Sequence, residues 1–506
     1  MTLLKKRSLI KGALVVTAFA LTVKLFGMLF RLYLTGRIGS EGIGLYQLIL
    51  SLYGMFTTFA TAGITVTVSR LAAECAATEG EAEARRLMWR AVRISLGISL
   101  TAGIIMFCFS GLMSNALLSD PRAATALRIL AFSMPFMGAA ACLKGWFFAA
   151  GQPVKPSCSS LLEQTVKISV IFAFLNISLK STNDLGRLCA GIAAGLTLGE
   201  IFSTCFLLVL YATSKRTKDK PSSDRRAADK KIISVCAPIA LSTYLTSLLH
   251  TGESLLIPGM FERYGGDRSS ALSQFGVIRG MVIPILFFPF SFLSSLISVM
   301  IPEISRLNTM SDRTLLRNKT SQIFRLSWIF AIAAGGLFFC FPSQMGQAFY
   351  RTDDATRAIR ILAAVTPFMY IETLSDGMLK SIGEQLWTLK VGIINSVLRI
   401  AVILTLIPAT GSDGYLLLLV VSNTFSFVMC YSRVKKTTGA KTDAISSVLI
   451  PLIGAAAGGA AGSFFTGCFS SAYAEAAAVT ASYLAVFAAF TLAAERAYGQ
   501  LLKKSA

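Results

Sequence analysis

The sequence predicts an all-α integral membrane protein, and three observations lead to this fold class. Of the 506 residues, 54% are hydrophobic and 15% are charged, whereas a soluble domain has about 25% charged residues. Apolar segments long enough to cross a bilayer recur along the whole chain. The connections between them are alternately rich and poor in lysine and arginine. The formal charge of +22 therefore serves membrane topology, and we expect no nucleic-acid partner.

We expect about fourteen transmembrane helices, because that number of apolar segments approaches the roughly 20 residues that a crossing needs. The first segment follows Lys-Lys-Arg and resembles a signal peptide. Lys24 interrupts it and no Ala-x-Ala-type cleavage site follows, so we expect a retained first helix. The segments lie at 8–33, 43–69, 88–111, 124–150, 157–179, 186–212, 231–250, 273–301, 321–341, 356–381, 386–408, 413–432, 444–467 and 474–496.

The distribution of basic residues predicts the orientation of these helices. Alternate connections hold 27 lysines and arginines on the side of the N-terminus and 10 on the opposite side. Because the excess marks the cytoplasmic side, both termini are predicted to lie in the cytoplasm. The most polar run, 215–231, predicts a flexible cytoplasmic linker.

An internal repeat divides the chain. RILAFSMPFM at 128–137 recurs as RILAAVTPFM at 360–369, and the offset of 232 also relates Arg93 to Arg325. A displacement of six spans keeps the orientation, so it predicts two six-helix lobes related by an axis along the membrane normal, with a site between them. The expected parts are a first lobe at 1–213, a basic linker at 214–230, a second lobe at 231–433 and two additional helices at 434–506.

The sequence lacks the residues that several kinds of chemistry require. The ten cysteines form no Cys-x-x-Cys pair, and His250 is the only histidine, so we expect no metal site and no cofactor. No phosphate-binding loop for ATP is present. A membrane glycosyl- or phosphotransferase would need paired carboxylates, and the only adjacent acids are Asp353 and Asp354. Their flanking cations indicate a salt-bridged helix start, so we expect no catalytic residue and no enzyme.

Charged residues inside the apolar segments are the candidate functional residues. We select seven cations and four acids of these segments, a surplus of about +3. The four-residue spacing of Glu163 and Lys167 predicts pairing on one helix face. The cations are Lys24, Arg31, Lys144, Lys167, Arg279, Lys380 and Arg399, and the acids are Glu163, Glu200, Glu372 and Asp376.

The cation surplus predicts an anionic cargo. Lys24, Arg31, Arg279 and Arg399 have no acid within one turn of their own helix, and arginine and lysine in a hydrated cavity suit a phosphate or pyrophosphate. We expect these four residues and Lys167 to bind the substrate. Glu163, Glu372 and Asp376 are candidates for structural pairing or for binding a coupling proton or sodium ion.

The segment KLFGMLFRLYLTGRIGSEGIGLYQLILSLYGMFTTFATAGITVTVSRLAAE, at 24–74, closely resembles the opening of the stage V sporulation protein B family. GMVIPILFFPFSFLSSLISVMIPEIS, at 280–305, resembles the eighth span of the same family. These are bacterial fourteen-helix proteins of the multidrug/oligosaccharidyl-lipid/polysaccharide exporter superfamily, related to the lipid II flippases. The resemblance covers essentially the whole chain and implies a multi-pass protein of the bacterial plasma membrane.

The resemblance implies a flippase with alternating access and a cationic central cavity. The cargo would be an undecaprenyl-pyrophosphate-linked sugar, lipid II or a relative, moved from the inner to the outer leaflet for cell-wall or spore-cortex synthesis. Lys24 and Arg31 correspond to the first-span arginine pair of the lipid II flippases, with Lys in place of the first Arg and a spacing of seven rather than six. Arg279 is the candidate for the eighth-span cation, and the last two helices would shape a groove for the lipid tail.

Three alternatives stay open. One is a flippase for another polyprenyl-linked saccharide, such as a capsule or teichoic precursor. A cation-coupled multidrug exporter is disfavoured by the cation surplus, and a membrane transferase by the lack of paired carboxylates. The bilayer, the anionic lipid and a coupling cation are the expected partners, and a monomer is sufficient for all of these functions.

Overall fold

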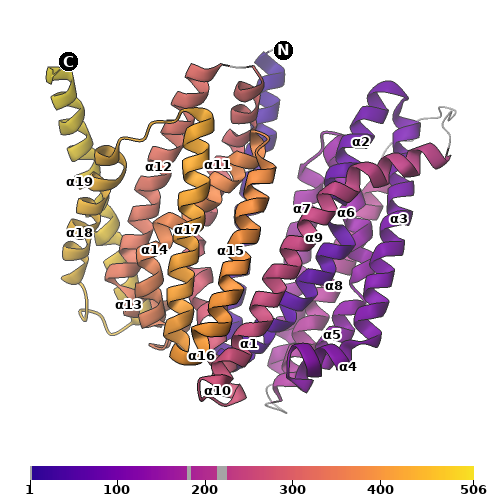
Figure 1. Cartoon of the computed structure of the whole chain (residues 1–506), viewed down its shortest axis with the longest axis horizontal. Coiled ribbons are helices and arrows are strands. Elements are labelled where there is room, and N and C mark those ends of the chain that lie inside the picture. The colour runs from indigo at the N-terminus through magenta and orange to yellow at the C-terminus, as the bar shows by residue number, and fades with distance from the viewer. Residues whose placement is uncertain (1–2, 179–183, 214–224, 311, 506) are drawn as a thin grey trace. The chain divides into compact units, whose positions relative to one another are not determined.

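The computed structural model describes residues 3–178, 184–213, 225–310 and 312–505, and within these ranges every regular element is a helix (Figure 1). The chain divides into two compact units, Met1–Leu256 and Ile257–Ala506. The boundary lies within α9 (Arg225–Arg263), so this helix contributes to both units. The prediction of an all-α membrane protein is confirmed.

The linker predicted at 214–230 is partly helical. α9 begins at Arg225, and residues 214–224 lie outside the described residues. The run RRAADKK at 225–231 consists mostly of good helix formers, which explains why a polar sequence extends the helix. The predicted lobe boundaries themselves stay a prediction.

The first unit packs its helices around two apolar clusters, one near Val68, Leu87 and Phe147 and one near Leu34 and Ile171. Its elements are α1 (Leu3–Thr61), α2 (Ile64–Thr78), α3 (Glu81–Cys108), α4 (Ser110–Leu112), η1 (Met113–Leu117), η2 (Pro121–Ala123), α5 (Ala124–Ala131), α6 (Met134–Ala149), α7 (Val154–Ser178), α8 (Leu185–Ala212) and the first part of α9.

The long first helix is interrupted by a glycine kink. Gly39 in α1 has φ 69° and ψ −177°, a conformation that glycine adopts at little cost. A second break follows at Gly63, where φ is 74° and a Cβ atom would lie 3.2 Å from the Cys236 carbonyl oxygen. The break at Gly63 divides the segment predicted at 43–69, and both the positive φ and the close approach of α9 make a side chain at this position unfavourable.

The second unit has one large apolar cluster, which includes Phe324, Trp328, Tyr370 and Tyr483. After the end of α9 its elements are α10 (Arg268–Phe275), η3 (Gly276–Val282), α11 (Ile283–Thr309), α12 (Arg313–Cys340), α13 (Pro342–Tyr350), α14 (Thr356–Ser381), α15 (Gln385–Thr405), α16 (Ile407–Thr410), α17 (Ser412–Thr438), η4 (Ile445–Leu449), α18 (Ile450–Ser463) and α19 (Ala472–Ser505).

The sequence repeat is visible in the helix bounds. α3 and α12 each contain 28 residues, and both their first and last residues are separated by the offset of 232 found in the sequence. The charged, proline and glycine positions that keep register in the sequence therefore mark equivalent helices. This equivalence allows α3 and α12 to be compared residue by residue.

Twelve helices in the described parts of the chain are long and apolar enough to cross a membrane. A thirteenth would be the pair Pro121–Ala131 and Met134–Ala149, which is bent by 45°. The first of the twelve, Val15–Thr78, has 64 residues and covers both of the first two predicted segments. The predicted number of fourteen crossings requires this stretch to cross twice, and it stays a prediction.

Candidate functional site

A group of charged side chains lies inside the first unit, where four transmembrane helices meet. Arg31 of α1 is half-buried and lies within electrostatic range of Lys167 of α7. Lys167 in turn lies within range of Glu163 on its own helix and Glu200 of α8. Lys144 of α6 completes the group, because its Nζ atom is 3.9 Å from Glu163 Oε2. Two of the five predicted substrate-binding cations are thus brought together.

The ion pair in this group differs from the predicted one. The four-residue spacing favoured pairing of Glu163 with Lys167, but the structure pairs Glu163 with Lys144 of a neighbouring helix. Both side chains of that pair are 25% exposed. Spacing along one helix permits a contact without requiring it, and packing of α6 against α7 supplies the alternative partner.

The two carboxyl groups of the cluster come from neighbouring helices. The side chains of Glu163 and Glu200 lie within electrostatic range of each other. The group therefore contains three basic side chains, those of Arg31, Lys144 and Lys167, and two carboxyl groups. Its formal net charge is about +1.

A glycine stripe brings Glu200 to this position. Gly191, Gly195 and Gly199 recur every four residues on the face of α8 that meets α7. A Cβ atom on Gly199 would lie 2.9 Å from the Glu163 carbonyl oxygen and 3.3 Å from Lys167 Cβ. Small residues at this spacing allow close approach of membrane helices. The Gly-x-x-x-Gly pattern was the sequence signal for this contact, and the sequence reasoning missed it.

Tyr53 of α1 borders the cluster. Its hydroxyl group lies 2.8 Å from Ser133 Oγ and 3.1 Å from Met137 Sδ, and its side chain is within electrostatic range of Glu200 and Glu163. A buried tyrosine needs such a partner for its hydroxyl. The contact connects the second half of α1 to the chain between α5 and α6.

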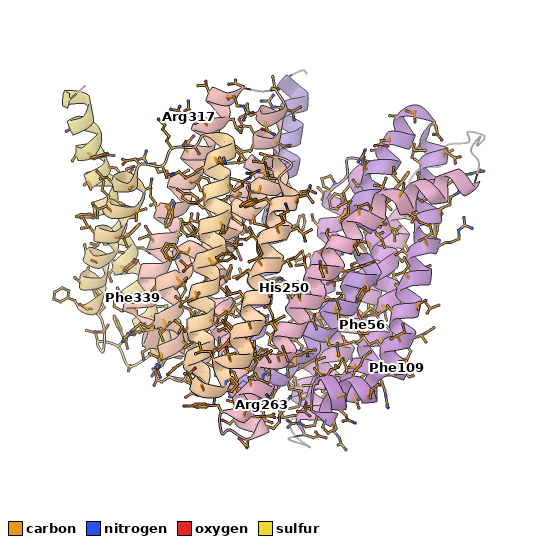
Figure 2. The ribbon with its side chains drawn as sticks, viewed as in Figure 1. Phe56, Phe109, His250, Arg263, Arg317 and Phe339 are labelled. Carbon is orange, nitrogen blue, oxygen red and sulfur yellow. The ribbon has the colours of Figure 1, made fainter. Side chains whose placement is uncertain are left out.

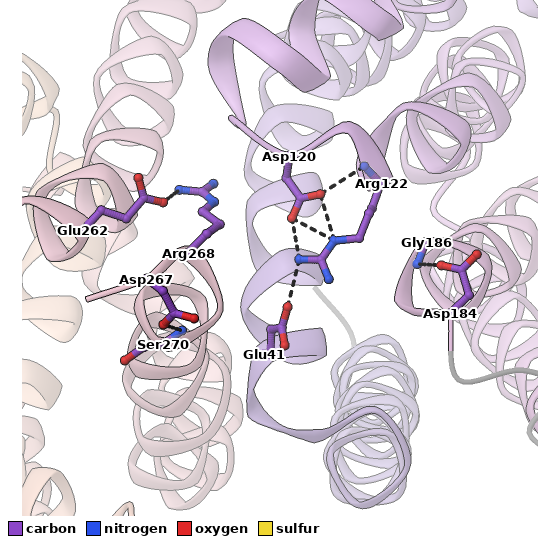
Figure 3. Close-up of polar contacts among 9 residues, drawn as sticks. All are labelled: Glu41, Asp120, Arg122, Asp184, Gly186, Glu262, Asp267, Arg268 and Ser270. Carbon is purple, nitrogen blue, oxygen red and sulfur yellow. Dashed lines mark hydrogen bonds and ion pairs between the residues drawn. The ribbon is translucent and has the colours of Figure 1, made fainter. Parts of the chain in front are cut away.

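Glu41, the first acidic residue of the chain, forms an ion pair with Arg122. Figure 3 shows the guanidinium group of Arg122 between two carboxylates, with Nη2 2.8 Å from Glu41 Oε1 and 2.7 Å from Asp120 Oδ2. Asp120 also caps the short helix η2 by accepting a hydrogen bond from the Arg122 backbone. Glu41 therefore stabilises the region after the Gly39 kink and is held by Arg122, which the sequence reasoning had counted only as a loop charge.

Lys24 and Arg31 differ in their environments. Lys24 is exposed and Arg31 is half-buried. The predicted eighth-span cation, Arg279, belongs to the second unit. The convergence of Lys24, Arg31 and Arg279 on one cavity therefore stays a prediction.

The second unit contains the other predicted charged set. Lys380 Nζ lies 2.6 Å from Asp376 Oδ2, so Asp376 has an ion pair on its own face of α14. Glu372, one turn away, accepts a hydrogen bond of 3.4 Å from Thr373 Oγ1 and lies within electrostatic range of both members of the pair. One of the cations in the predicted surplus is therefore neutralised by its own helix.

Arg279 and Arg399 occupy different kinds of helix. Arg279 is half-buried in η3, a π-helical turn at Gly276–Val282, and such turns occur often at functional sites. Arg399 is half-buried in α15. Their role in substrate binding stays a prediction.

A buried carboxyl group was missed by the sequence reasoning. Glu253 of α9 is 0% exposed, and its Oε2 atom lies 3.8 Å from Nδ1 of His250, which is labelled in Figure 2. The predicted span ended at residue 250, whereas α9 continues to Arg263. The run His-Thr-Gly-Glu ends the apolar segment, but a polar turn does not stop a helix.

The adjacent acids Asp353 and Asp354 have local structural roles. Asp353 accepts hydrogen bonds from Ser343 Oγ at 2.9 Å and Gln347 Nε2 at 3.0 Å. Asp354 accepts one from Thr352 Oγ1 at 2.9 Å. The partners are hydroxyl and amide groups where the sequence predicted flanking cations. Among the described residues, no group of three or more His, Cys, Asp or Glu side chains could hold a metal ion.

The first unit also contains an apolar cavity of about 380 Å³. It is lined by residues of α2, α3 and α9, among them Val68, Ile94, Ile98 and Leu241. This lining suits hydrocarbon rather than a charged headgroup. The cavity is therefore distinct in chemistry from the charged group around Lys167.

Comparison with solved structures shows which fold the chain has. The lipid II flippase MurJ in an inward closed conformation superposes with a TM-score of 0.74 at 12% identity, covering 96% of this chain and 99% of that one. An inward-facing multidrug resistance MATE family transporter of the MOP superfamily gives a TM-score of 0.65 at 16% identity, covering 84% and 98%. The chain is an all-α membrane protein with the fold of the MOP-superfamily transporters.

Sequence comparison then identifies the family. The profile of the polysaccharide biosynthesis protein family matches residues 9–308, more than half of the chain, and the chain belongs to this family. The MatE profile matches residues 244–405. The predicted resemblance is confirmed by stage V sporulation protein B of Bacillus subtilis (strain 168), 22% identical over 383 residues, which are 74% of this chain and 73% of that protein. Sporulation protein YkvU of the same organism is 20% identical over 356 residues, 70% of this chain and 78% of that protein.

Proposed function

We propose that this protein is a flippase that moves an undecaprenyl-pyrophosphate-linked saccharide, lipid II or a related cell-wall precursor, from the inner to the outer leaflet by alternating access. The observation that carries the proposal is the grouping of Arg31, Lys144 and Lys167 around the carboxyl groups of Glu163 and Glu200. The polysaccharide biosynthesis family and the MurJ-like fold support it.

The physical argument rests on uncompensated charge inside a membrane protein. A cation at the centre of the bilayer costs about 3 kcal/mol on insertion scales, so a net positive group requires a negative partner. A pyrophosphate supplies compact negative charge and accepts bidentate hydrogen bonds from arginine. The headgroup would bind these cations while the polyprenyl tail remains in lipid.

The remaining predicted residues belong to the same proposal. Lys24, Arg279 and Arg399 would add contacts to the headgroup in other steps of transport. Glu163, with its partner Glu200, and Glu372 and Asp376 are the candidates for binding a coupling proton or sodium ion. The protein would act in the bacterial plasma membrane with both termini in the cytoplasm.

Translocation of fluorescent lipid II in proteoliposomes tests the proposal. We expect Arg31→Ala and Lys167→Ala each to reduce the initial rate at least about tenfold, because each removes a charge-assisted contact worth about 1.5–3 kcal/mol. Lys24→Ala and Arg279→Ala complete the series. Arg357→Gln is the matched control, since Arg357 is 72% exposed and pairs with Asp413. Wild-type rates in all four alanine variants would refute the assignment of the cargo site.

A second candidate function is cation-coupled export of a small molecule. The MatE match over residues 244–405 includes Glu372 and Asp376, carboxyl groups of the kind that bind a coupling cation. The same proteoliposomes, loaded with a cationic dye and energised by a proton or sodium gradient, separate the two functions. Dye export with no translocation of lipid II, or of another polyprenyl-pyrophosphate saccharide, would favour the exporter.

A further inference from the structure

One face of α12 is covered by the C-terminal part of the chain, and its polar contacts are specific. Arg325 pairs with Glu495 of α19, with Nη2 2.9 Å from Oε1. One turn earlier, Ser321 Oγ accepts a hydrogen bond of 3.0 Å from the backbone N–H of Lys441, in the segment before α18. The cation on this face of α12 thus has a carboxylate of the same chain beside it.

The apolar part of the same face is covered equally closely. A Cβ atom on Gly336 would lie 2.8 Å from Ala455 Cβ of α18, and one on Gly459 would lie 2.8 Å from Cys340 Sγ. Ile332, between Arg325 and Gly336 along this face, is 3% exposed. The two C-terminal helices, α18 and α19, thus cover this face of α12.

The equivalent face of α3 in the first unit has no such cover. The offset of 232 maps Ser321, Arg325, Ile332, Gly336 and Cys340 onto five residues that we call the α3 stripe. Leu100 of the stripe is 51% exposed, where its equivalent Ile332 is buried, and the other members are exposed as well. The stripe consists of Trp89, Arg93, Leu100, Ile104 and Cys108.

Two arginines at one end of the α3 stripe are available to a ligand. Arg93 is exposed, and so is Arg86, which lies about two turns earlier on the same face of the helix. In the part of the chain that the structure describes, neither arginine has a hydrogen bond or an ion pair. Trp89 lies between them, and tryptophan is enriched at the level of the lipid headgroups.

We propose that the α3 stripe binds an anionic phospholipid. The phosphate group would lie between Arg86 and Arg93 beside Trp89, where it takes the place that the Glu495 carboxylate occupies in the second unit. The acyl chains would cover Leu100 and Ile104. Basic side chains at the membrane surface attract anionic lipids, and an arginine can bind phosphate through two parallel hydrogen bonds.

The stripe favours a lipid over a second protein helix. Gly336 lets Ala455 and Tyr483 pack directly against α12, but the equivalent position of α3 is Ile104, a side chain that is 54% exposed. Helices that associate in membranes approach at small residues. Flexible acyl chains can pack around a projecting isoleucine, whereas a helix at the distance of α18 cannot.

This inference is independent of the proposed cargo. Arg86 and Arg93 lie on α3, whereas the cations of the candidate site lie on α1, α6 and α7. Loss of the phospholipid site would not remove a group that binds the pyrophosphate. The two proposals therefore predict different variants and different measurements.

Native mass spectrometry and thermal unfolding of the full chain in a neutral detergent test the site, with phosphatidylglycerol and phosphatidylcholine as probes. We expect wild-type protein to bind phosphatidylglycerol more tightly than phosphatidylcholine and to unfold at a higher temperature in its presence. Arg93→Gln should weaken phosphatidylglycerol binding about fivefold, and Arg86→Gln should do the same. Arg93→Lys keeps the charge and should retain binding within about twofold, which separates ligand binding from folding.

Arg70→Gln is the matched control, because Arg70 is an exposed cation of the neighbouring helix α2 that pairs with Glu74 at 2.9 Å. It should bind phosphatidylglycerol as the wild type does. Equal affinity of the wild type for the two lipids would overturn the proposal, as would unchanged binding in the variant that lacks both Arg86 and Arg93. A dimer that forms without added lipid and is lost in Arg93→Gln would also overturn it, in favour of a second copy on this face.

Discussion

Arg433 of α17 binds both carboxylate oxygens of Glu384, the residue that precedes α15, with Nη2 2.9 Å from Oε1 and 2.8 Å from Oε2. The guanidinium group also lies 4.9 Å from the centre of the Trp387 ring. A bidentate pair stacked on an aromatic ring is more ordered than a single surface contact. This contact connects the start of α15 to α17 within the second unit.

We therefore expect Glu384→Gln to destabilise the second unit by about 1 kcal/mol, a value reduced for the partial exposure of both side chains. Thermal unfolding in detergent measures the change. Asp413→Asn, which removes the more exposed single contact with Arg357 at 3.0 Å, should cost less than about 0.5 kcal/mol. Equal losses in the two variants would contradict the special role of the bidentate geometry.

Gly199→Ala should separate α7 from α8. The added methyl group would meet the backbone of Glu163 at 2.9 Å, and backbone cannot rotate away, so we expect a loss of about 1–3 kcal/mol and slower translocation. Gly54→Ala in α1 is the control, because a Cβ atom there meets nothing within 4 Å. If Gly199→Ala unfolded at the wild-type temperature, the close approach of α7 and α8 would be wrong.

The ion pair of Glu163 predicts unequal effects for the two carboxyl groups. Glu163 pairs with Lys144, whereas Glu200 has no ion pair among the residues that the structure describes, so Glu200→Gln should change the stability less than Glu163→Gln does. Glu163→Gln leaves Lys144 without its carboxylate and should cost about 1–2 kcal/mol, allowing for partial exposure. A double-mutant cycle with Lys144→Met measures the coupling free energy between Lys144 and Glu163. A coupling of zero would show that the 3.9 Å pair contributes nothing to stability.

Asp443 predicts a dependence of stability on acid pH. Partial burial raises the pKa of its carboxyl group, but hydrogen bonds from Ile445 and Ser446 outweigh this and hold the pKa below its ordinary value. A carboxyl group whose pKa is lower in the folded state stabilises the fold above its unfolded-state pKa of about 4, and this stability is lost as the pH falls through the folded pKa. Asp443→Ala should therefore lower the unfolding temperature at pH 7 and have progressively less effect at more acid pH, as thermal scans across this range will measure.

The fold could be predicted because its main signals are local. Apolar length and the alternation of basic residues identify transmembrane helices without any knowledge of their neighbours. The repeat gave the equivalence of α3 and α12, whose bounds keep the offset of 232. The kink at Gly39 and the continuation of α9 beyond His250 depend on backbone geometry that hydropathy does not report.

The candidate site was predictable in its residue types and less so in its contacts. Arg31, Lys167 and Glu163 were identified from charge inside apolar segments, and the structure groups them. The partner of Glu163 is decided by which helix packs against α7, so spacing along one helix selected Lys167 where the structure has Lys144. The proximity of Glu200 to Glu163 and Lys167 depends on the glycines of α8. This is a packing signal, and an interpretation based on charge alone does not consider it.

The unequal cover of α3 and α12 makes two equivalent helices differ in what they present to their surroundings. Removing the chain beyond Gly439 would expose Ile332 and free Arg325 from Glu495, so that α12 would present the same kind of face as α3. The C-terminal helices are therefore what makes the two repeats unlike on this face.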